Sequence, residues 1–421
     1  MISYAEALAL INDVVKPMAA AHLPLRELIG AATSETVTSN MAVPGFANSA
    51  MDGFALRAND TVSAAADTPL TLNVAGIVAA GDPPPDAPPP GASIEIMTGA
   101  PMPAGCDAVV PIERVVTQGE TNGVIASIRI ETPATPGQNV RAAGEDFMAG
   151  QPVLGSGCLI EPHDVMALAA TGIDAIRARA SARIAIVTTG SELTASGTPE
   201  QDGMIRDSNG PYLEAFIAQT GAQLTARRNV PDAAPALDAA LRELASTTDV
   251  ILTTGGVSAG RYDLIPDAIK RSGGKVIFHK VAMRPGKPLL FAQLAGGTLM
   301  FGLPGNPMAV AAGLRFFVVP ALRRLQGLAP EHYLTAICDA AIRKRADLRF
   351  FGKAFATIDS EGRLRARLLP GQESFKIQPL TAANCWAIVT EGREHVAEGE
   401  LIQVAPLYPT RFLQPVPAPM G

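Results

Sequence analysis

The strongest constraint on the fold is a repeated order of apolar run, glycine loop and helical segment between residues 181 and 327. The runs RIAIVTTGSEL and TDVILTTGGVSAG predict strands that end in glycine loops, and NGPYLEAFIAQTGA, PALDAALRELAS and DLIPDAIKRSG predict helices. Strands that alternate with helices of this length form a mostly parallel sheet. Because such sheets bind ligands outside the carboxyl ends of their strands, the loops TTGSEL and TTGGVSAG mark the expected active face.

Three further regions surround this α/β domain. Residues 40–139 contain short β-rich runs separated by Gly, Pro and Asp, which predicts a compact β domain. Residues 1–39 and 140–180 combine helical and extended patterns, and we expect them to form a linker domain. Residues 328–421 return to alternating runs, which predict a small C-terminal β domain. The expected fold class is a multi-domain protein with a central α/β domain, two small β-rich domains and a helical and extended linker.

Composition and charge exclude several classes of function. The 421 residues are 48% hydrophobic and 18% charged, which is typical of a globular chain. The net charge of −6 and the lack of a long Lys/Arg run argue against nucleic-acid binding. The uncharged run 288–314 is long enough to span a bilayer, but its glycines and prolines argue against a membrane segment. Four cysteines without a CxxC pair and an N-terminus without a signal pattern predict a reduced, cytoplasmic protein.

The loop TTGGVSAG is a candidate anion site. Gly255 and Gly256 follow an apolar strand, where their backbone N–H groups can face a phosphate or pyrophosphate. A double glycine can equally be no more than a tight turn, but Ser258 and Asp263 add a hydroxyl and a carboxylate to this segment.

A second candidate anion site is the segment KVAMRPGKP. It places Lys280, Arg284 and Lys287 around a Pro-Gly turn, and three cations suit an oxyanion such as phosphate or molybdate. A solvated basic turn is the competing interpretation. The following GLPGNP motif predicts a rigid turn before a helix, and the backbone of Gly305 either faces the same crevice or simply begins that helix.

Carboxylates recur in the loops of the α/β domain, at Glu192, Asp207, Asp232 and Asp263. Hard cations such as Mg²⁺ bind one or two carboxylates together with phosphate oxygens and water. Each residue can also be a turn residue or helix cap, an interpretation that is strong for Asp207 and Asp232, which precede expected helices. These carboxylates can bind one metal ion only if the fold brings their side chains close together.

The β domain contributes two polar residues next to glycines. Asp52 lies in NSAMDGFA and Thr98 lies in IMTGAPMPAGCDAVV. An Asp-Gly turn without hairpin alternation on both sides indicates a carboxylate placed for function, although ordinary turn chemistry competes.

Eight motifs occur in one order over most of the chain: NSAMDGFA, MTGAPMPAGCDAVV, RAAGEDF, TTGSEL, DSN, TTGGVSAG, RPGKP and GLPGNP. This set resembles the molybdopterin molybdenumtransferase family, which includes the bacterial enzyme and the gephyrin E-domain. The resemblance implies a homodimer of four-domain subunits, with the linker domain also serving dimerisation. It further implies an active site between the α/β domain of one subunit and the β domain of the other.

The resemblance also implies the reaction. Adenylylated molybdopterin is cleaved at its pyrophosphate in a molybdate- and Mg²⁺-dependent step that releases AMP, with Zn²⁺ as the alternative metal. The expected transient partner is the enzyme that adenylylates molybdopterin.

The family's functional positions can be carried onto this chain. They fall on Asp52, Thr98, Glu192, Asp232, Asp263, Lys280, Pro304 and Pro307. The segment GQESFKIQPLTAANC resembles a family segment whose serine helps bind molybdate, which points to Ser374. The residues expected to bind substrate are Lys280 and Ser374 together with Asp207, Ser208, Asn209, Gly255, Gly256, Ser258, Arg284, Lys287 and Gly305.

Three assignments concern the metal and the molybdate contacts. Asp263, Asp52 and Glu192 are the expected metal ligands. Arg284 stands where the family commonly has Lys, which keeps the charge but changes the geometry. Arg349 and Lys353 are both candidates for the family's basic contact in the C-terminal domain.

Two other functions compete with this interpretation. The first is a non-catalytic molybdopterin-binding or scaffolding protein, which a loss of acidic site residues would favour. The second is a related α/β enzyme that adenylylates the pterin, against which the β-domain motifs and GLPGNP count.

Overall fold

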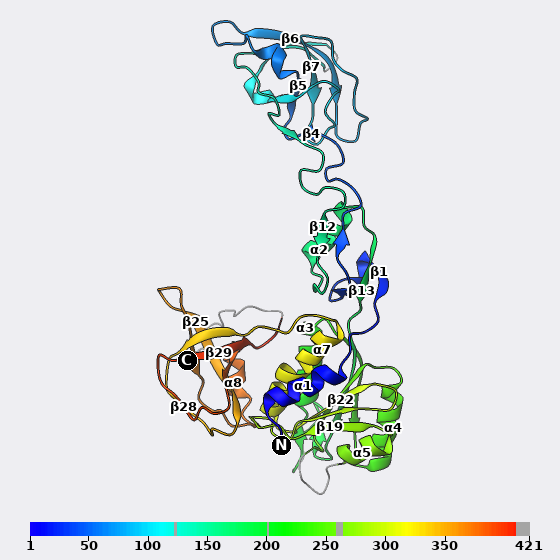
Figure 1. Ribbon diagram of the computed structural model, residues 1–421, viewed down its shortest axis with the longest axis vertical. Coiled ribbons are helices and arrows are strands. Elements are labelled where there is room, and N and C mark those ends of the chain that lie inside the picture. Colours follow the sequence, from blue (N-terminus) through cyan, green and yellow to red (C-terminus); the bar gives the residue numbers. More distant parts are fainter. Residues whose placement is uncertain (122–123, 200–201, 258–263, 410–421) are drawn as a thin grey trace. The chain divides into compact units, whose positions relative to one another are not determined.

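The computed structural model describes residues 1–121, 124–199, 202–257 and 264–409 (Figure 1). The chain divides into two compact units. Unit 1 comprises Met1–Glu35, Gly157–Glu161 and Arg177–Gly421, and unit 2 comprises Thr36–Ser156 and Pro162–Ile176.

Unit 2 is built around a six-stranded sheet with the order β8-β5-β7-β6-β10-β9. Its strands are β5 (Gly53–Leu56), β6 (Leu70–Val78), β7 (Ala92–Ile96), β8 (Ala108–Pro111), β9 (Val116–Thr121) and β10 (Val124–Ile130). β6 and β7 pair in parallel, and the other neighbours pair antiparallel. Phe54 and Leu56 enter one buried cluster, whereas Ala55 enters another, as expected for a strand with both faces covered.

Short elements complete unit 2. They are the ladder of β4 (Asn48–Ser49) with β11 (Val140–Arg141), the ladder of β3 (Val37–Thr38) with β12 (Pro152–Leu154), the 3₁₀ turns η2 (Ala58–Thr61) and η3 (Ile112–Arg114), and the helix α2 (Pro162–Ala170).

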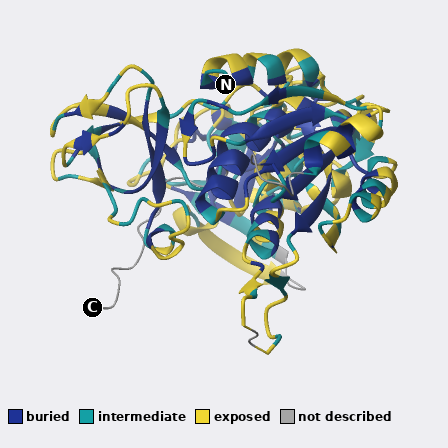
Figure 2. Ribbon diagram, turned by 90° about the horizontal axis from the view of Figure 1, so that it is seen from below, coloured by how far each residue is buried: buried dark blue, intermediate teal, exposed yellow. Residues whose placement is uncertain are grey.

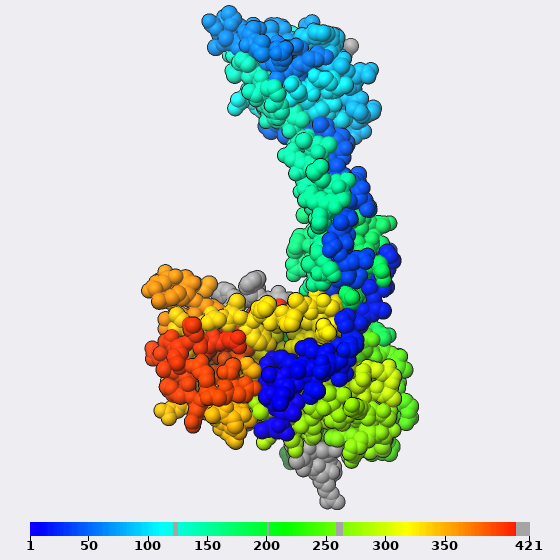
Figure 3. Space-filling model, in the orientation of Figure 1, coloured from blue at the N-terminus to red at the C-terminus, as the bar shows by residue number. Residues whose placement is uncertain are grey.

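The helix α1 (Tyr4–Val14) opens unit 1. It begins with a capping box in which Ser3 Oγ accepts from the Glu6 N–H (3.2 Å) and the Glu6 carboxylate accepts from the Ser3 N–H (2.7 Å). Tyr4, Ala7 and Ile11 form its buried side, and the helix packs beside the C-terminal residues of the same unit (Figure 3). The 3₁₀ turn η1 (Leu25–Glu27) follows α1 in the chain, and the strands β1 (Ala21–Pro24), β13 (Ala175–Arg179) and β2 (Ala32–Thr33) form a small sheet in that order.

The α/β domain contains a six-stranded sheet with the order β17-β14-β18-β22-β21-β19. Its strands are β14 (Arg183–Thr189), β17 (Gln223–Val230), β18 (Val250–Thr254), β19 (Lys275–His279), β21 (Leu290–Gln293) and β22 (Leu299–Leu303). The first four strands of the order pair in parallel, and β21 pairs antiparallel with both β22 and β19. The prediction of a mostly parallel sheet is therefore confirmed.

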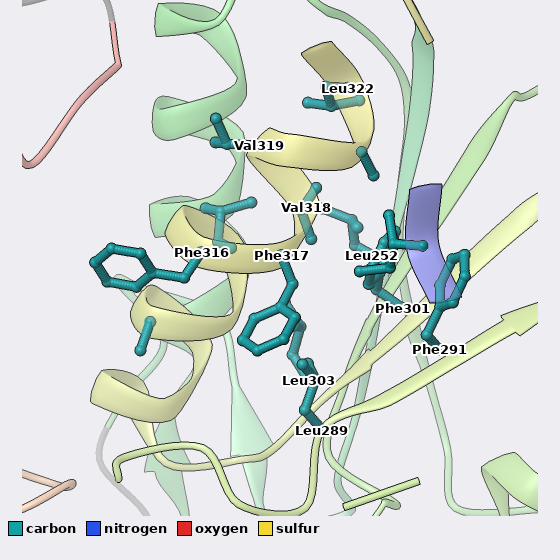
Figure 4. Close-up of a cluster of buried hydrophobic side chains, with 14 of the residues drawn as sticks. Leu252, Leu289, Phe291, Phe301, Leu303, Phe316, Phe317, Val318, Val319 and Leu322 are labelled. Atoms are coloured by element: carbon teal, nitrogen blue, oxygen red, sulfur yellow. The ribbon is translucent and has the colours of Figure 1, made fainter. Parts of the chain in front are cut away.

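Helices cover both faces of this sheet. Ile184 and Ile186 of β14 pack into a cluster with α1, α3 (Asn209–Gln219), α6 (Pro307–Gly313) and α7 (Val319–Leu325). Figure 4 shows other members of this cluster, including Leu252 of β18, Phe301 of β22 and Val319 of α7. Ala185 and Val187 pack on the opposite face with α4 (Ala234–Ala245) and α5 (Ile265–Arg271). Figure 2 shows the central strands buried beneath helices whose outer sides are exposed. A π-helical turn, η4 (Leu314–Val318), joins α6 to α7, and β15 (Leu193–Thr194) pairs with β16 (Ile205–Arg206) beside the sheet.

The C-terminal part of unit 1 is a small closed barrel. Its strands are β23 (Leu334–Cys338), β25 (Arg349–Ile358), β26 (Leu364–Leu368), β27 (Cys385–Val389) and β29 (Leu401–Pro406). Pairing between β25 and β27 closes the order β25-β26-β23-β29-β27 into a ring. The two-residue strand β20 (Met283–Arg284) pairs with β25 and joins the RPGKP turn to the barrel. The ladder of β24 (Ile342–Arg343) with β28 (His395–Val396) and the helix α8 (Gln378–Thr381) complete this part.

The uncharged run 288–314 forms β21, β22 and α6 instead of one long helix. Across the described ranges, none of the helices combines the length and the apolarity that crossing a membrane requires.

Candidate active site

A cavity of about 560 Å³ lies in unit 1 where four loops meet. One loop follows β18, the second is the RPGKP turn, the third is the GLPGNP turn and the fourth is residues 372–375 of the C-terminal barrel. Its volume lies in the range of small-molecule binding sites. The predicted residues that line it are Gly256, Arg284, Lys287, Pro304, Gly305 and Ser374.

The first loop depends on glycine because backbone segments approach closely. Gly255 has φ of +85°, and a Cβ atom there would lie 2.8 Å from the Thr189 carbonyl oxygen. Its N–H donates to the Leu303 carbonyl (3.1 Å), which ties the loop to β22. Gly256 follows with φ of +64° and lines the cavity. Ser258 and Asp263 lie outside the described residues.

Two of the three predicted cations reach the cavity. Arg284 and Lys287 are exposed side chains on its wall, on either side of a turn that contains a cis Arg284–Pro285 peptide bond. Lys280 is not a lining residue. Its backbone adopts φ of +75°, its N–H donates to the Leu289 carbonyl (2.9 Å) and its carbonyl accepts from the Ile2 N–H (3.2 Å). The backbone of Lys280 thus links the N-terminus to Leu289, which directly follows the turn.

The GLPGNP turn connects two other predicted segments. The Gly305 carbonyl accepts from Asn209 Nδ2 (2.8 Å), which ties the DSN motif to this turn. Pro307 begins α6, and the N–H of the next residue, Met308, donates to the Ser374 carbonyl (3.0 Å). The turn therefore connects α3 and the barrel loop at the edge of the cavity. Ser208, next to Asn209, is exposed and makes no side-chain cap for α3.

Lys353 holds the barrel loop that carries Ser374. Its side chain is 2% exposed, and Nζ donates to the carbonyls of Glu373 (3.3 Å) and Lys376 (3.0 Å). Burial lowers the pKa of the Lys353 ammonium, although the nearby Glu373 carboxylate partly opposes this shift. Lys353 does not line the cavity. Its position indicates support of the loop from below rather than direct contact with a ligand.

Arg349, the other candidate basic contact, lies elsewhere in the same domain. Its guanidinium is 3.3 Å from the Glu391 carboxylate and 4.3 Å from the centre of the Tyr4 ring. It is not a lining residue of the cavity. The structure therefore directs attention to Arg284 and Lys287 as the cations of this site.

Several lining residues were given no role by the sequence, among them Gln372 and Phe375. The Gln372 amide accepts from the Lys353 N–H (3.0 Å) and donates to the carbonyls of Lys353 (2.8 Å) and Leu369 (2.7 Å). Phe375 is 64% exposed. Their adjacency to Ser374 was the available signal, but no spacing pattern marks either residue.

The carboxylates of the α/β domain have different local roles. Asp207 is buried, with Oδ1 accepting from the Gly210 N–H (2.9 Å) and Oδ2 from Arg227 Nη2 (2.9 Å). Asp207 therefore caps α3, as its competing interpretation predicted. Asp232 does not cap α4, which has no side-chain cap. Instead, its Oδ2 accepts from the Ser191 N–H (3.1 Å) and supports the TTGSEL loop.

Clustering of these carboxylates is not seen in the described part of the chain. Within those ranges, no group of three or more His, Cys, Asp or Glu side chains could hold a metal ion. Glu192 is exposed on the TTGSEL loop, and Asp263 lies outside the described residues.

In unit 2, Asp52 and Thr98 come together from different loops. The Thr98 N–H and hydroxyl both donate to Asp52 Oδ1, at 2.6 and 2.7 Å. These two hydrogen bonds lower the pKa of Asp52 because they stabilise the ionised carboxylate. The next residue, Gly53, allows no Cβ because the Val110 carbonyl occupies that space. The result is an exposed, oriented and ionised carboxylate.

Comparisons with known proteins show the family of this chain. Residues 2–172 match the MoeA N-terminal region (domain I and II), residues 185–324 match the probable molybdopterin binding domain, and residues 335–407 match the MoeA C-terminal region (domain IV). A molybdopterin molybdenumtransferase from Synechococcus elongatus is 34% identical over 97% of this chain and 100% of its own length. Molybdopterin molybdenumtransferase 2 from Mycobacterium tuberculosis is 35% identical over 91% of this chain and 94% of its own.

A solved structure shows the same fold over nearly the full length. The molybdopterin biosynthesis MoeA protein from Pyrococcus horikoshii OT3 superposes with a TM-score of 0.77 at 27% identity, covering 96% of this chain and 99% of that one. Because the relatives match almost end to end, the similarity is not that of a shared single domain. The chain therefore belongs to the MoeA family of molybdopterin molybdenumtransferases.

Proposed function

We propose that this chain inserts molybdate into adenylylated molybdopterin and releases AMP. The observation that carries the proposal is the cavity of unit 1, where Arg284, Lys287, Ser374 and the glycine loop converge. Molybdate and the pyrophosphate of the substrate are both oxyanions, and this set of cations, hydroxyl and backbone N–H groups suits oxyanions. A cavity of about 560 Å³ also leaves room for more than one tetrahedral anion.

The residues of the cavity have distinct chemical roles in this proposal. The Arg284 guanidinium can donate to two oxygens of one anion, whereas the Lys287 ammonium acts as a compact charge. The Ser374 hydroxyl donates to molybdate. No side chain has to act as a covalent nucleophile, because water or a molybdate oxygen can attack the phosphorus while these donors stabilise the charge that develops.

We propose Asp52, Glu192 and Asp263 as ligands of Mg²⁺, with Zn²⁺ as the alternative. Asp52 fits this role because Thr98 holds its exposed carboxylate ionised. Mg²⁺ is commonly held by one or two carboxylates plus phosphate oxygens and water, so the substrate can supply the rest. When bound, the metal would neutralise charge that develops on the split pyrophosphate.

We further propose a cytoplasmic homodimer that receives its pterin transiently from the adenylylating enzyme. Large apolar side chains of unit 2 support association, since they are between 40% and 72% exposed and a second copy would cover them. They are Met41, Phe46, Met51, Met148 and Met166.

Turnover of adenylylated molybdopterin tests the proposed reaction. The purified chain should release AMP when molybdate and Mg²⁺ are both present, and EDTA should stop the release. A scaffolding protein would bind molybdopterin without releasing AMP, so an absence of AMP would overturn the proposal.

Variants separate the anion site from the metal site. Ser374→Ala and Arg284→Ala should raise the KM for molybdate. Lys270→Ala is the control, because Lys270 is an exposed cation on α5, and its removal should leave this KM unchanged. Asp263→Asn should slow AMP release by about 10²-fold, because removing a preorganised charge has costs of this order. Near-normal release by Asp263→Asn would refute its metal role.

Mixed dimers test whether two subunits share a site. Asp52→Asn and Asp263→Asn chains should each be nearly inactive. When they are co-refolded in equal amounts, half of the dimers contain both variants and each of those has one intact shared site, so about a quarter of wild-type activity should return. No recovery in dimers shown to be mixed would contradict a shared site.

A further inference from the structure

Phe375 is an aromatic side chain that the catalytic proposal leaves without a role. It is 64% exposed, yet it lines the same cavity as Arg284 and Lys287. A large apolar ring exposed on the wall of a cavity is available to be covered by a bound ligand. It belongs neither to the two clusters of the α/β sheet nor to the cluster of the C-terminal barrel.

The loop beneath Phe375 is held firmly on both sides. The carbonyls of the flanking residues Glu373 and Lys376 both accept from the buried Lys353 Nζ, and the Ser374 carbonyl accepts from the Met308 N–H. Binding of a ligand therefore needs little further ordering of this backbone. The position of Phe375 is preorganised, whereas its exposed side chain becomes ordered when a ligand covers it.

The chemistry around the ring indicates the kind of ligand. The Lys376 ammonium lies 6.0 Å from the ring centre, and Arg284 and Lys287 supply two more cations on the cavity wall. An aromatic face next to several cations suits a molecule that joins a flat heterocycle to phosphate groups. Molybdate alone has no flat surface and would leave the ring uncovered.

We propose that Phe375 stacks on a planar nitrogen heterocycle of the substrate and thereby helps to select adenylylated molybdopterin. This inference rests on the proposed function. The heterocycle is either the pterin or the adenine, which present the same flat π-face. In this role Phe375 is a specificity residue rather than a catalytic one, because its ring takes no part in bond making.

The test uses the full-length protein and three substitutions at this position. Phe375→Ala and Phe375→Leu remove the ring and should raise the KM for adenylylated molybdopterin about tenfold, the order expected for one lost stacking contact. Phe375→Trp keeps a flat ring and should stay within about threefold of wild type. The KM for molybdate should not change in any of them.

The neighbouring Ile377→Ala is the matched control. Ile377 is 42% exposed and does not line the cavity, so its truncation should leave both KM values at wild type. Calorimetry should measure the binding of AMP and of molybdopterin separately, to wild type and to Phe375→Ala. The ligand that binds more weakly to Phe375→Ala is the one that carries the stacked heterocycle.

Two results would overturn the role of Phe375. One is a KM of Phe375→Ala for adenylylated molybdopterin within twofold of wild type. The other is an equal KM for adenylylated molybdopterin in Phe375→Leu and Phe375→Trp, because the size of the side chain and not its aromatic ring would then determine binding. If the wild-type protein itself released no AMP, the proposed function would fail first, and the two failures are therefore distinguishable.

Discussion

Lys353→Met should weaken both the C-terminal barrel and molybdate binding. Methionine keeps the apolar stem but removes the ammonium, so the carbonyls of Glu373 and Lys376 lose their shared donor. A hydrogen bond from a charged donor contributes about 1.5–3 kcal/mol, but methionine avoids the desolvation that lowers the lysine pKa. We expect a net loss of about 1–3 kcal/mol in the free energy of unfolding at pH 7.

Tryptophan fluorescence during urea unfolding measures this loss directly. Trp386 is the chain's one tryptophan, is 1% exposed and pairs with Lys353 across β27 and β25. Its emission therefore reports on the barrel that contains the substitution. Lys376→Met on the same loop is the matched control, because its exposed ion pair with Glu373 should change stability by less than about 1 kcal/mol.

The pH dependence gives an independent check on the same residue. The pKa of Lys353 in the folded protein lies below the value of about 10.4 for an unfolded chain. Between these two values the unfolded chain binds more protons, so the contribution of this group to stability rises with pH. The stability difference between wild type and Lys353→Met should therefore grow as pH rises through this window.

The KM for molybdate should also rise severalfold in Lys353→Met, because Ser374 lies between the two released carbonyls. A variant with unchanged stability, unchanged KM and a stability difference independent of pH would refute the reasoning. Such a result would mean that the packing of the loop, and not the buried ammonium, holds Ser374.

Three further predictions concern other parts of the structure. Thr98→Val removes one of the two hydrogen bonds to Asp52 and should lower kcat/KM for AMP release about tenfold. Thr98→Ser keeps the hydroxyl and should retain most activity. Equal kcat/KM values for the two variants would contradict the positioning role of Thr98. Glu331→Ala leaves the fully buried Arg315 guanidinium without its carboxylate partner (2.5 and 2.8 Å) and should cost about 3 kcal/mol of unfolding free energy in urea titrations. Asp207→Ala should cost about 2 kcal/mol by the same assay, through loss of the α3 cap and the Arg227 pair, and a change below 0.5 kcal/mol would argue against that role.

Patterns that are local in the chain were predicted well. The order of strands, glycine loops and helices in the α/β domain followed from hydrophobic periodicity, because backbone hydrogen bonding imposes those periods on every strand and helix. The turn at Gly255 was also expected, and the close approach of β14 leaves no space for a Cβ atom there, but its N–H, which was expected to face an anion, donates to the Leu303 carbonyl. The capping role considered for Asp207 was also local, because its carboxylate accepts from the N–H of Gly210, three positions later in the chain.

Contacts between distant segments were decided by tertiary packing alone. Asp232 was predicted as a functional residue, with helix capping as the competing interpretation; it accepts from the Ser191 N–H instead of capping α4, because parallel pairing of β17 with β14 brings the two loops together. Lys353 was a candidate ligand contact, and closure of the barrel places its ammonium under the loop of Ser374 instead. Phe375 carried no signal in the sequence beyond its position next to Ser374. Phe375 suggests a ligand contact only because the fold brings Arg284 and Lys287 of the α/β domain to the same cavity. Hydrophobic periodicity in the sequence does not predict contacts between two domains.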